Sequence, residues 1–488
     1  MRRILACAAS GLLAACASSD IPQVEPAGSI ALAPDYFAES RPPAGLKAAW
    51  WRGFGDNRLD GLVGEALRRN QTLAAARARL AAARAVLRAE RADFLPTIDG
   101  DVTLGGSVDD AGTALDDASA GLGGVWTLDL NGRLSAERAE ALAGVEASQY
   151  ALADRRRLIA SAVANRFVEL RRTAARLRLL EQSADLQRRT LNIVQLREEA
   201  GLSSNFDVRR AAADLSRTLS QRGPLLLARA RAANALSVLS GEPPAEVPGT
   251  DGSAEGGSGG DADGDADGEA DIPDYARGPG LGVPADLLRA RPDLLLAEAD
   301  IAAAAARVGV ERADLLPALT LPGFLTLGDG SVDGLFSEAV AGLSAVLGVP
   351  LLDGGRRRAE VAAAEAGLNA ALADYRQVLL EALAEVESAL VAIRSAEDRR
   401  DELANAVAES EAAFEQSSAL YREGLASLFD VLDVQRQLIG SREALIDAEA
   451  ALAQAYIDLF TATGAPAPAD APAPAPDPAP DLAEAPQG

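Results

Sequence analysis

The sequence predicts a mixed fold that combines long α-helices with membrane-spanning β-strands. Three observations predict it: a tandem duplication, two long proline-free segments with heptad spacing, and four short runs in which apolar and polar residues alternate. Helices repeat about every 3.5 residues and strands every 2, so each copy of the duplicated unit is expected to hold both kinds of element.

The duplication is visible in three pairs of motifs. Arg91-Ala-Asp-Phe-Leu-Pro96 returns as Arg312-Ala-Asp-Leu-Leu-Pro317, Ala151–Asp154 returns as Ala371–Asp374, and Gly201–Val208 returns as Gly424–Val431. The order is kept and the offsets are 220 to 223 residues. Repeats of this kind are typical of ring-like or tubular architectures rather than of enzymes with one catalytic site. We therefore expect a first repeat over 50–248 and a second over 281–464.

The first residues have the pattern of an export signal. Two arginines precede an apolar run from Ile4 to Ala15, which is too short to span a membrane as a helix. Leu13–Cys16 looks like a bacterial lipobox, so we expect residues 1–15 to be a lipoprotein signal peptide and Cys16 to be lipidated, with 16–49 as a linker. Ala and Ser follow the cysteine, which by the same likeness favours the outer membrane. The alternative is an ordinary signal peptide.

The composition excludes several classes of function. The chain has 72 acidic and 47 basic residues, a formal net charge of −25 and no histidine. Such a chain repels nucleic acid, which is not expected as a partner. Without histidine, and with the mature chain's single cysteine acylated, there is no triad or zinc site, so we expect no enzyme activity and no cofactor. The Ala/Pro-rich residues 465–488 are expected to be a disordered tail.

Two segments, 135–199 and 356–422, are expected to form long coiled-coil-like helices. Both lack proline and carry apolar residues at heptad spacing, such as Val145 and Leu152 in the first. A helix of about 65 residues is roughly 100 Å long at 1.5 Å per residue. Glycines at the ends of these segments predict left-handed caps, from which the chain turns back as antiparallel hairpins. Shorter helices are expected over 57–94, 205–240, 286–315 and 428–463.

Four alternating runs are expected to be β-strands, over about 97–108, 119–130, 318–328 and 340–351. Each has about the length of a membrane-spanning strand. Four strands cannot close a barrel and an open edge is not tolerated in lipid, so several chains must share one barrel. A dimer, a trimer and a tetramer all remain open. The alternative is a small soluble sheet that caps a helical bundle, because Trp126 and Phe324 are almost the only interfacial aromatic residues.

An acidic insert over 249–280, rich in Gly and Asp, is expected to be a mobile loop between the repeats. Asp263, Asp265, Asp267 and Asp271 in it have the spacing of a calcium-binding loop. The loop ends in Asp274 where an EF-hand has glutamate, and its flanks are not helical, so this calcium site is a weak hypothesis.

Several ordered motifs together resemble one family: Trp50–Leu59, Val283–Asp293, Asp353–Arg356 and the duplicated Gly-Leu-x-Ser turn. The chain resembles TolC-like outer-membrane efflux factors, in particular the NodT-type lipoprotein branch, from the lipobox to about residue 464. The resemblance implies a homotrimer with a shared 12-stranded β-barrel, four strands per chain, a long periplasmic α-helical barrel and a small α/β equatorial region. It also implies a passive duct that works with a periplasmic adaptor and an inner-membrane pump of RND type.

Two of these motifs have structural interpretations as well. Trp50, Trp51 and Phe54 are expected to be packing anchors, and Arg291-Pro-Asp293 is expected to start a helix. The remaining alternative for the whole chain is a lipid-anchored periplasmic coiled-coil scaffold without a pore.

By the same resemblance, the tunnel narrows after the second hairpin turn, where acidic side chains form rings. The matching positions are Asp430 and Asp433; the first repeat keeps Asp207 but has Arg210 where the second has Asp433. We hypothesise that Arg210 pairs with one of these aspartates when the pore is closed; the alternative is that these are solvated charges at a helix end. The expected adaptor contacts, which could equally be helix caps, are Gly201, Leu202, Ser203 and Ser204 with Gly424, Leu425, Ala426 and Ser427.

Overall fold

The computed structural model describes residues 21–23, 35–36, 49–108, 114–244, 271–275, 283–284, 291–327 and 338–464. The expected signal peptide, Cys16, most of the acidic insert and the C-terminal tail lie outside these residues. The chain divides into two compact units, and each unit takes segments from both repeats. Unit 1 contains Met1–Ala38, Arg69–Arg155 and Gly282–Ser388, and unit 2 contains Glu39–Arg68, Arg156–Leu281 and Ala389–Gly488.

Unit 1 carries an antiparallel sheet built from β2 (Thr97–Val108), β3 (Ala114–Leu128), β5 (Ala318–Leu327), β6 (Ala339–Leu343) and β7 (Val346–Gly348). Each repeat contributes one hairpin, and β3 joins the two by pairing with β5, so that Trp126 lies opposite Leu321. The edges are β2 on one side and β6 with β7 on the other. A separate two-stranded ladder pairs β1 (Asp35–Tyr36) with β4 (Val283–Pro284).

The fourth expected strand is interrupted. β6 and β7 pair with β5 in one continuous register, which would place Ser344 opposite Pro322. Proline has no backbone N–H to donate, so the ladder lapses there; the Ser344 N–H and hydroxyl both donate to the Pro322 carbonyl, at 3.0 and 3.4 Å.

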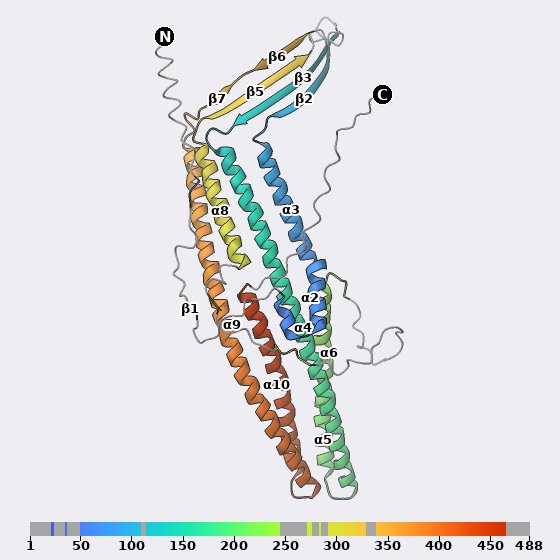
Figure 1. Ribbon diagram of the computed structural model, residues 1–488. Helices are drawn as coiled ribbons and strands as arrows, with labels where there is room; N and C mark the ends of the chain where they lie inside the picture. Colours follow the sequence, from blue (N-terminus) through green and yellow to red (C-terminus); the bar gives the residue numbers. More distant parts are fainter. Residues whose placement is uncertain are drawn as a thin grey trace, which may run out of the picture. The chain divides into compact units, whose positions relative to one another are not determined.

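The helices of unit 1 meet the sheet at their ends (Figure 1). α3 (Gln71–Ala92) precedes β2 and α8 (Pro292–Ala313) precedes β5; each has 22 residues, as duplication requires. α8 begins at the expected Arg-Pro-Asp motif. Arg291 is 2% exposed and its guanidinium contacts Asp293 at 2.6 Å and Glu385 at 2.9 Å.

The two long helices are α4 (Arg133–Glu199) and α9 (Arg356–Arg422), with 67 residues each. The heptad prediction is confirmed, since Val145, Leu152, Val163 and Leu177 are all buried. Acidic side chains hold their first turns: Asp129 accepts from the N–H groups of Leu134 and Ser135, and Asp353 accepts from those of Gly355 and Arg357.

Unit 2 contains the second halves of both long helices with α2 (Asn57–Arg69), α5 (Asn205–Ser220), α6 (Arg222–Leu239) and α10 (Leu428–Ala462). Two helices expected as single are divided. Asn70 separates α2 from α3 because its side chain accepts from the N–H groups of Thr72 and Leu73 and starts a new helix. The break at Gln221 between α5 and α6 lies just before Pro224, which cannot donate an N–H to the preceding turn.

An aromatic cluster packs η2 against the end of α10 in unit 2. The 3-10 helix η2 (Trp50–Phe54) buries Trp50, Trp51 and Phe54, which confirms that they are packing anchors. Trp50 contacts Phe460 near the end of α10, and Tyr275 contacts both Phe54 and Phe460.

Candidate functional site

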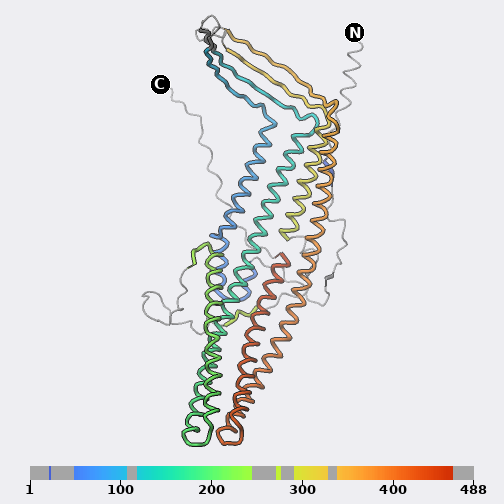
Figure 2. The backbone as a smooth tube through the Cα atoms, turned by 180° about the vertical axis from the view of Figure 1, so that it is seen from behind, coloured from blue at the N-terminus to red at the C-terminus, as the bar shows by residue number. Residues whose placement is uncertain are grey.

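The two hairpin turns of unit 2 lie side by side in both views of the backbone (Figures 1 and 2). The first hairpin is the end of α4, the turn 200–204 and α5; the second is the end of α9, the turn 423–427 and α10. Gly201 and Gly424 have φ values of +71° and +79°, so the predicted left-handed caps are confirmed. Matching bonds close both turns, from Leu202 N–H to the Arg197 carbonyl at 2.8 Å and from Leu425 N–H to the Leu420 carbonyl at 2.9 Å.

Each turn is followed by a capping box. Ser204 Oγ accepts from the Asp207 N–H at 3.3 Å, and the Asp207 carboxylate accepts from the Ser204 N–H at 3.2 Å. Ser427 and Asp430 form the same pair in the second hairpin, at 3.3 and 3.0 Å. Hydrogen bonds from the serine hydroxyl and N–H hold the pKa of both aspartates below its ordinary value. Both carboxylates are therefore ionised at neutral pH and hold the helix starts.

The other two predicted charged residues have different neighbours. Asp433 contacts Arg436 in the next turn of α10, at 3.2 Å. The Arg210 guanidinium lies 4.6 Å from the ring centroid of Phe429. In the part of the chain that the structure describes, Arg210 therefore contacts an aromatic ring of the second hairpin, and its pairing with an aspartate in a closed pore stays a prediction.

The outer ends of the hairpins carry large apolar side chains as well as small residues. Leu202, Phe206, Leu425 and Phe429 are between 52% and 72% exposed. The two phenylalanines occupy matching positions of the repeat and were not among the predicted site residues. The signal that could have identified them is the Phe-Asp-Val motif, which both repeats contain directly after the turn.

A buried cluster joins the two hairpins just behind their turns. Val194 of the first hairpin packs with four residues of the second, Tyr421, Leu428, Val431 and Leu432. The Arg197 guanidinium lies 4.8 Å from the Tyr421 ring centroid and donates to the Tyr421 carbonyl at 3.1 Å. We call this cluster, with Arg197, Arg210 and Phe429, the tip seam. Periodicity alone does not reveal it, because its members come from different repeats.

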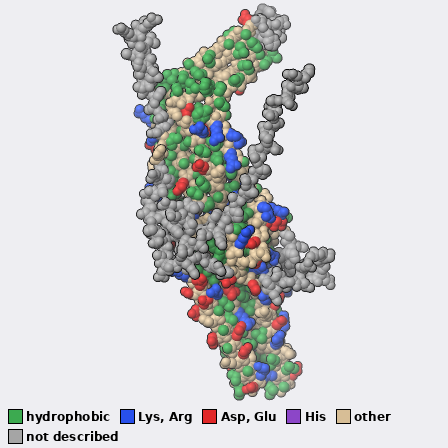
Figure 3. All heavy atoms as spheres, in the orientation of Figure 1, with side chains coloured by type: hydrophobic (Ala, Val, Ile, Leu, Met, Phe, Trp, Pro, Cys, Tyr) green, Lys and Arg blue, Asp and Glu red, His purple; other side chains and the backbone are tan. Residues whose placement is uncertain are grey.

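The sheet of unit 1 has a different surface. Figure 3 shows hydrophobic side chains gathered over the strands and charged ones over the helices. In Figure 1 the described helices join the sheet at its end and none of them is drawn over either face, and Ile98, Val102 and Leu104 of β2 are about 70% exposed. The Trp126 indole donates to the Phe94 carbonyl at 3.0 Å, which fixes it at the helical end of β3. None of the described helices combines the length and hydropathy that a membrane span requires.

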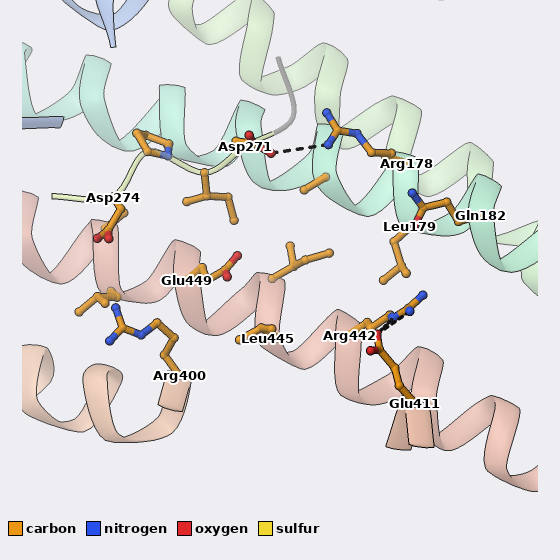
Figure 4. Close-up of a pocket in the computed structure, with 16 residues that line it drawn as sticks. Arg178, Leu179, Gln182, Asp271, Asp274, Arg400, Glu411, Arg442, Leu445 and Glu449 are labelled. Atoms are coloured by element: carbon orange, nitrogen blue, oxygen red, sulfur yellow. Dashed lines mark hydrogen bonds and ion pairs between the residues drawn. The ribbon is translucent and has the colours of Figure 1, made fainter. Parts of the chain in front are cut away.

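Asp271 is the one calcium candidate that lies within the described residues; Asp263, Asp265 and Asp267 lie outside them. It points toward Arg178, at 3.6 Å, on the rim of a hollow of about 590 Å³ (Figure 4). Burial raises the pKa of Glu449, which lines the same hollow; Arg400 opposes that shift, while Asp274 and Asp271 add to it. Over the described ranges no three acidic side chains are grouped closely enough to hold a metal ion.

Comparison with known proteins gives one family. The family described as outer membrane efflux protein matches residues 62–242 and 283–465. The pyoverdine export outer membrane protein OpmQ of Pseudomonas aeruginosa is 31% identical over 486 residues, covering 95% of this chain and 97% of OpmQ. Nodulation protein T of Rhizobium leguminosarum bv. viciae is 29% identical and covers 87% of this chain and 86% of its own. The solved structure of the outer-membrane channel OprN matches with a TM-score of 0.78 at 26% identity, over 91% of this chain and 99% of that one.

Proposed function

The chain belongs to the outer membrane efflux protein family, and on that basis we propose that it is the passive outer-membrane duct of a tripartite efflux system. One observation carries the proposal: a single chain combines a sheet that no described helix is seen to cover (Figure 1) with two long helices that end in paired turns. The sheet suits a wall against lipid and the helices suit a wall around an aqueous tunnel. The substrate crosses without chemical change, so the chain needs no catalytic residue and no cofactor.

Three copies of the chain share one barrel in this proposal. β2 and β6 leave unpaired backbone groups at the two edges of the sheet, and lipid cannot satisfy such groups. Pairing the β2 edge of one copy with the β6 edge of the next satisfies them and closes a ring. Three copies give the 12 strands that the TolC-like resemblance implies. A pore-free scaffold would leave both the edges and the apolar faces unexplained.

The hairpin turns are the proposed contact with a periplasmic adaptor. Gly201–Ser204 and Gly424–Ser427 end the two hairpins, and exposed leucines flank both glycines. Small residues and apolar tips allow another helical hairpin to approach closely and to bury Leu202 and Leu425. An inner-membrane pump, of RND type by family resemblance, supplies the energy and selects the substrate.

The periplasmic gate consists of Asp430, Asp433, Asp207 and Arg210 in this proposal. Asp430 and Asp433 lie on the exposed first turns of α10, so three copies would place rings of carboxylates around the tunnel axis. Like charges at close range repel, so such rings require cations or cationic partners. The capping box keeps Asp430 ionised at neutral pH, and Arg210 of the first hairpin contacts Phe429, the neighbour of Asp430 on the second hairpin.

Lipidation of Cys16 adds a second attachment to the outer membrane. The lipobox pattern supports acylation, while the barrel holds the protein in the membrane independently. These two attachments are separable by mutation, and this separation provides the test.

The experiment is to express a Cys16→Ser variant with a cleavable signal peptide and to measure its mass in mild detergent by light scattering. A particle of three chain masses recovered from the outer-membrane fraction is expected, and it should conduct potassium and chloride ions in a planar lipid bilayer. A soluble monomer or dimer in the periplasm would overturn the duct and leave the anchored scaffold.

A further inference from the structure

α3 is a basic helix in an acidic chain. Its 22 residues hold five arginines and one glutamate, whereas the whole chain has a formal net charge of −25. Four of the arginines follow one another at spacings of 7, 4 and 3 residues, which places them on one face of the helix: Arg77, Arg84, Arg88 and Arg91. Of these, Arg84, Arg88 and Arg91 are exposed, and we call these three side chains the arginine stripe.

The arginine stripe is not neutralised by its own chain. Neither an ion pair nor a hydrogen bond joins its three guanidinium groups to the part of the chain that the structure describes. By contrast, Arg133 at the start of α4 contacts both Glu137 and Asp314, at 2.9 and 3.0 Å. Three exposed, unpaired cations on one helix face of an acidic protein indicate an anionic partner outside the chain.

The arginine stripe ends where the sheet begins. Arg91 lies one residue before the end of α3 and six residues before Thr97, the first residue of β2. At 1.5 Å per residue, Arg84 and Arg91 are about 10 Å apart along the helix. The polar headgroup layer of a bilayer is roughly 5 to 8 Å thick on each side of the hydrocarbon core. If the sheet crosses that core, the stripe covers the depth of one headgroup layer, and the long arginine stems provide the remaining reach.

An aromatic residue lies at the same level. Trp126, on the strand that pairs with β2, donates from its indole to the carbonyl of Phe94, which follows Arg91 by three residues. The indole ring combines an apolar body with one polar N–H, and tryptophan is typical of the boundary between headgroups and hydrocarbon. Arg91 and Trp126 therefore place this boundary at the junction of α3 and β2.

The face of α3 that carries the stripe corresponds to the outer side of the proposed duct. Figure 3 shows basic side chains over α3 on the same face of unit 1 as hydrophobic side chains of the sheet. The second repeat supports this assignment, because α8 has Gly309 where α3 has Arg88, 221 residues earlier. A Cβ built on Gly309 would lie 3.1 Å from the side chain of Ile21. Ile21 follows Cys16, the proposed lipid attachment, by five residues, and a lipid-anchored segment must run outside the tunnel.

We propose that Arg84, Arg88 and Arg91 bind the phosphate groups of anionic phospholipids at the periplasmic surface of the outer membrane. The inference rests on the proposed function, because it requires the sheet to lie in a membrane. A guanidinium donates two parallel hydrogen bonds to a phosphate, and each basic side chain near an anionic lipid surface strengthens binding by about fivefold. The contacts hold the junction of α3 and the sheet at the level of the headgroups.

The test uses Trp126 as a reporter of the lipid beside the stripe. The full-length protein is reconstituted in vesicles of dioleoylphosphatidylcholine with increasing fractions of phosphatidylglycerol that is brominated in its acyl chains, because bromine quenches tryptophan fluorescence on contact. The reverse mixture, with brominated phosphatidylcholine, completes the measurement of the binding constant of phosphatidylglycerol relative to phosphatidylcholine. A Trp126→Phe protein gives the background from Trp50 and Trp51.

Phosphatidylglycerol should be preferred by about tenfold or more at low ionic strength, and about 1 M sodium chloride should remove most of the preference because it screens exposed charges. Arg88→Gln should lower the preference about fivefold. The matched control is Arg79→Gln, since Arg79 is also exposed but lies on another face of α3 and about 20 Å from its end. This control should keep the preference of the unsubstituted protein.

Equal quenching by the two lipids in the unsubstituted protein overturns the inference, and it is the result expected if a neighbouring copy covers the stripe. Equal preferences in Arg79→Gln and Arg88→Gln overturn it as well. A triple variant with Arg84, Arg88 and Arg91 all replaced by glutamine should still be quenched by either lipid but without preference, which separates lost headgroup binding from failed insertion. If neither brominated lipid quenches Trp126, the sheet does not lie in a membrane, and the proposed function fails together with the inference.

Discussion

Trp50 stacks on Phe460, with 5.2 Å between the ring centroids and 10° between the ring planes. Both side chains are less than 5% exposed, and Tyr275 lies 5.0 Å from Phe460 by its ring centroid. The stack joins η2, at the start of the first repeat, to the end of α10, at the end of the second. The residues that bracket the duplication are thus packed together in unit 2.

Replacing Trp50 by alanine should lower the free energy of unfolding by about 3 to 5 kcal/mol, because it leaves a large cavity in an aromatic core. The control is Trp126→Ala, for which a smaller loss is expected because Trp126 is already 39% exposed, although it gives up its hydrogen bond to the Phe94 carbonyl. Urea unfolding of the protein in detergent, followed by far-ultraviolet circular dichroism, measures both. Equal losses for the two tryptophans would contradict the anchoring role of Trp50.

Arg291 should be far more sensitive to substitution than a surface arginine. Its side chain is 2% exposed and is shared between Asp293 and Glu385, so Arg291→Ala removes the partner of two carboxylates at the start of α8. A loss of about 1.5 to 3 kcal/mol is expected, the range for hydrogen bonds to charged groups, because Arg291 is buried while Glu385 is 54% exposed. Arg312→Ala is the control: its contact with Glu365 is exposed on both sides, and a loss below about 1 kcal/mol is expected. The same unfolding experiment measures both variants. A small loss for Arg291→Ala would show that water can take the place of the guanidinium beside the two carboxylates.

Local signals in the sequence account for the long helices and their turns, but not for the places where elements break. Residues 356–422 form one helix because proline is absent, apolar spacing is regular and Gly424 supplies the cap. The break at Asn70 depends on one side chain that bonds to two backbone groups in a segment of otherwise unbroken helical periodicity. The gap between β6 and β7 has its cause in the partner strand, at Pro322, so the gapped segment itself carries no signal.

The site was predicted only in part, for a similar reason. The turn residues and the acidic positions repeat in the sequence, and alignment of the two copies finds them. The capping role of Asp207 and Asp430 follows from Ser-x-x-Asp spacing, whereas the family resemblance assigns both aspartates to a gate. The contacts of Arg197 and Arg210 join side chains from different repeats, and no local pattern records which face of one hairpin meets the other.

The Asp207 capping box should weaken on acidification. The pKa of Asp207 in the folded protein is below its unfolded value of roughly 3.9, so the box contributes stability above that pH and loses it as pH falls through the folded value. Hydrogen exchange of the peptide that contains the start of α5, corrected for intrinsic rates, should show reduced protection below about pH 4. Asp207→Asn is the control, because it cannot titrate and its protection should not change with pH. An identical pH profile for the two proteins would mean that the carboxylate does not hold the turn.

Glycine at the second turn should be required for its conformation rather than for space. Gly424 has a φ of +79° and its missing Cβ would meet no atom within 4 Å, so any cost of Gly424→Ala comes from the left-handed backbone. That cost is roughly 1 to 2 kcal/mol for a residue with a Cβ.

Gly440 provides the matched control, because it lies inside α10, also with no atom within 4 Å of a built Cβ. Gly440→Ala should stabilise the helix by about 0.5 to 1 kcal/mol. Opposite shifts of the urea midpoint are therefore expected for the same chemical change at two positions 16 residues apart on one hairpin. If both substitutions stabilise the protein, the second turn tolerates another backbone conformation, and the left-handed cap is not what closes it.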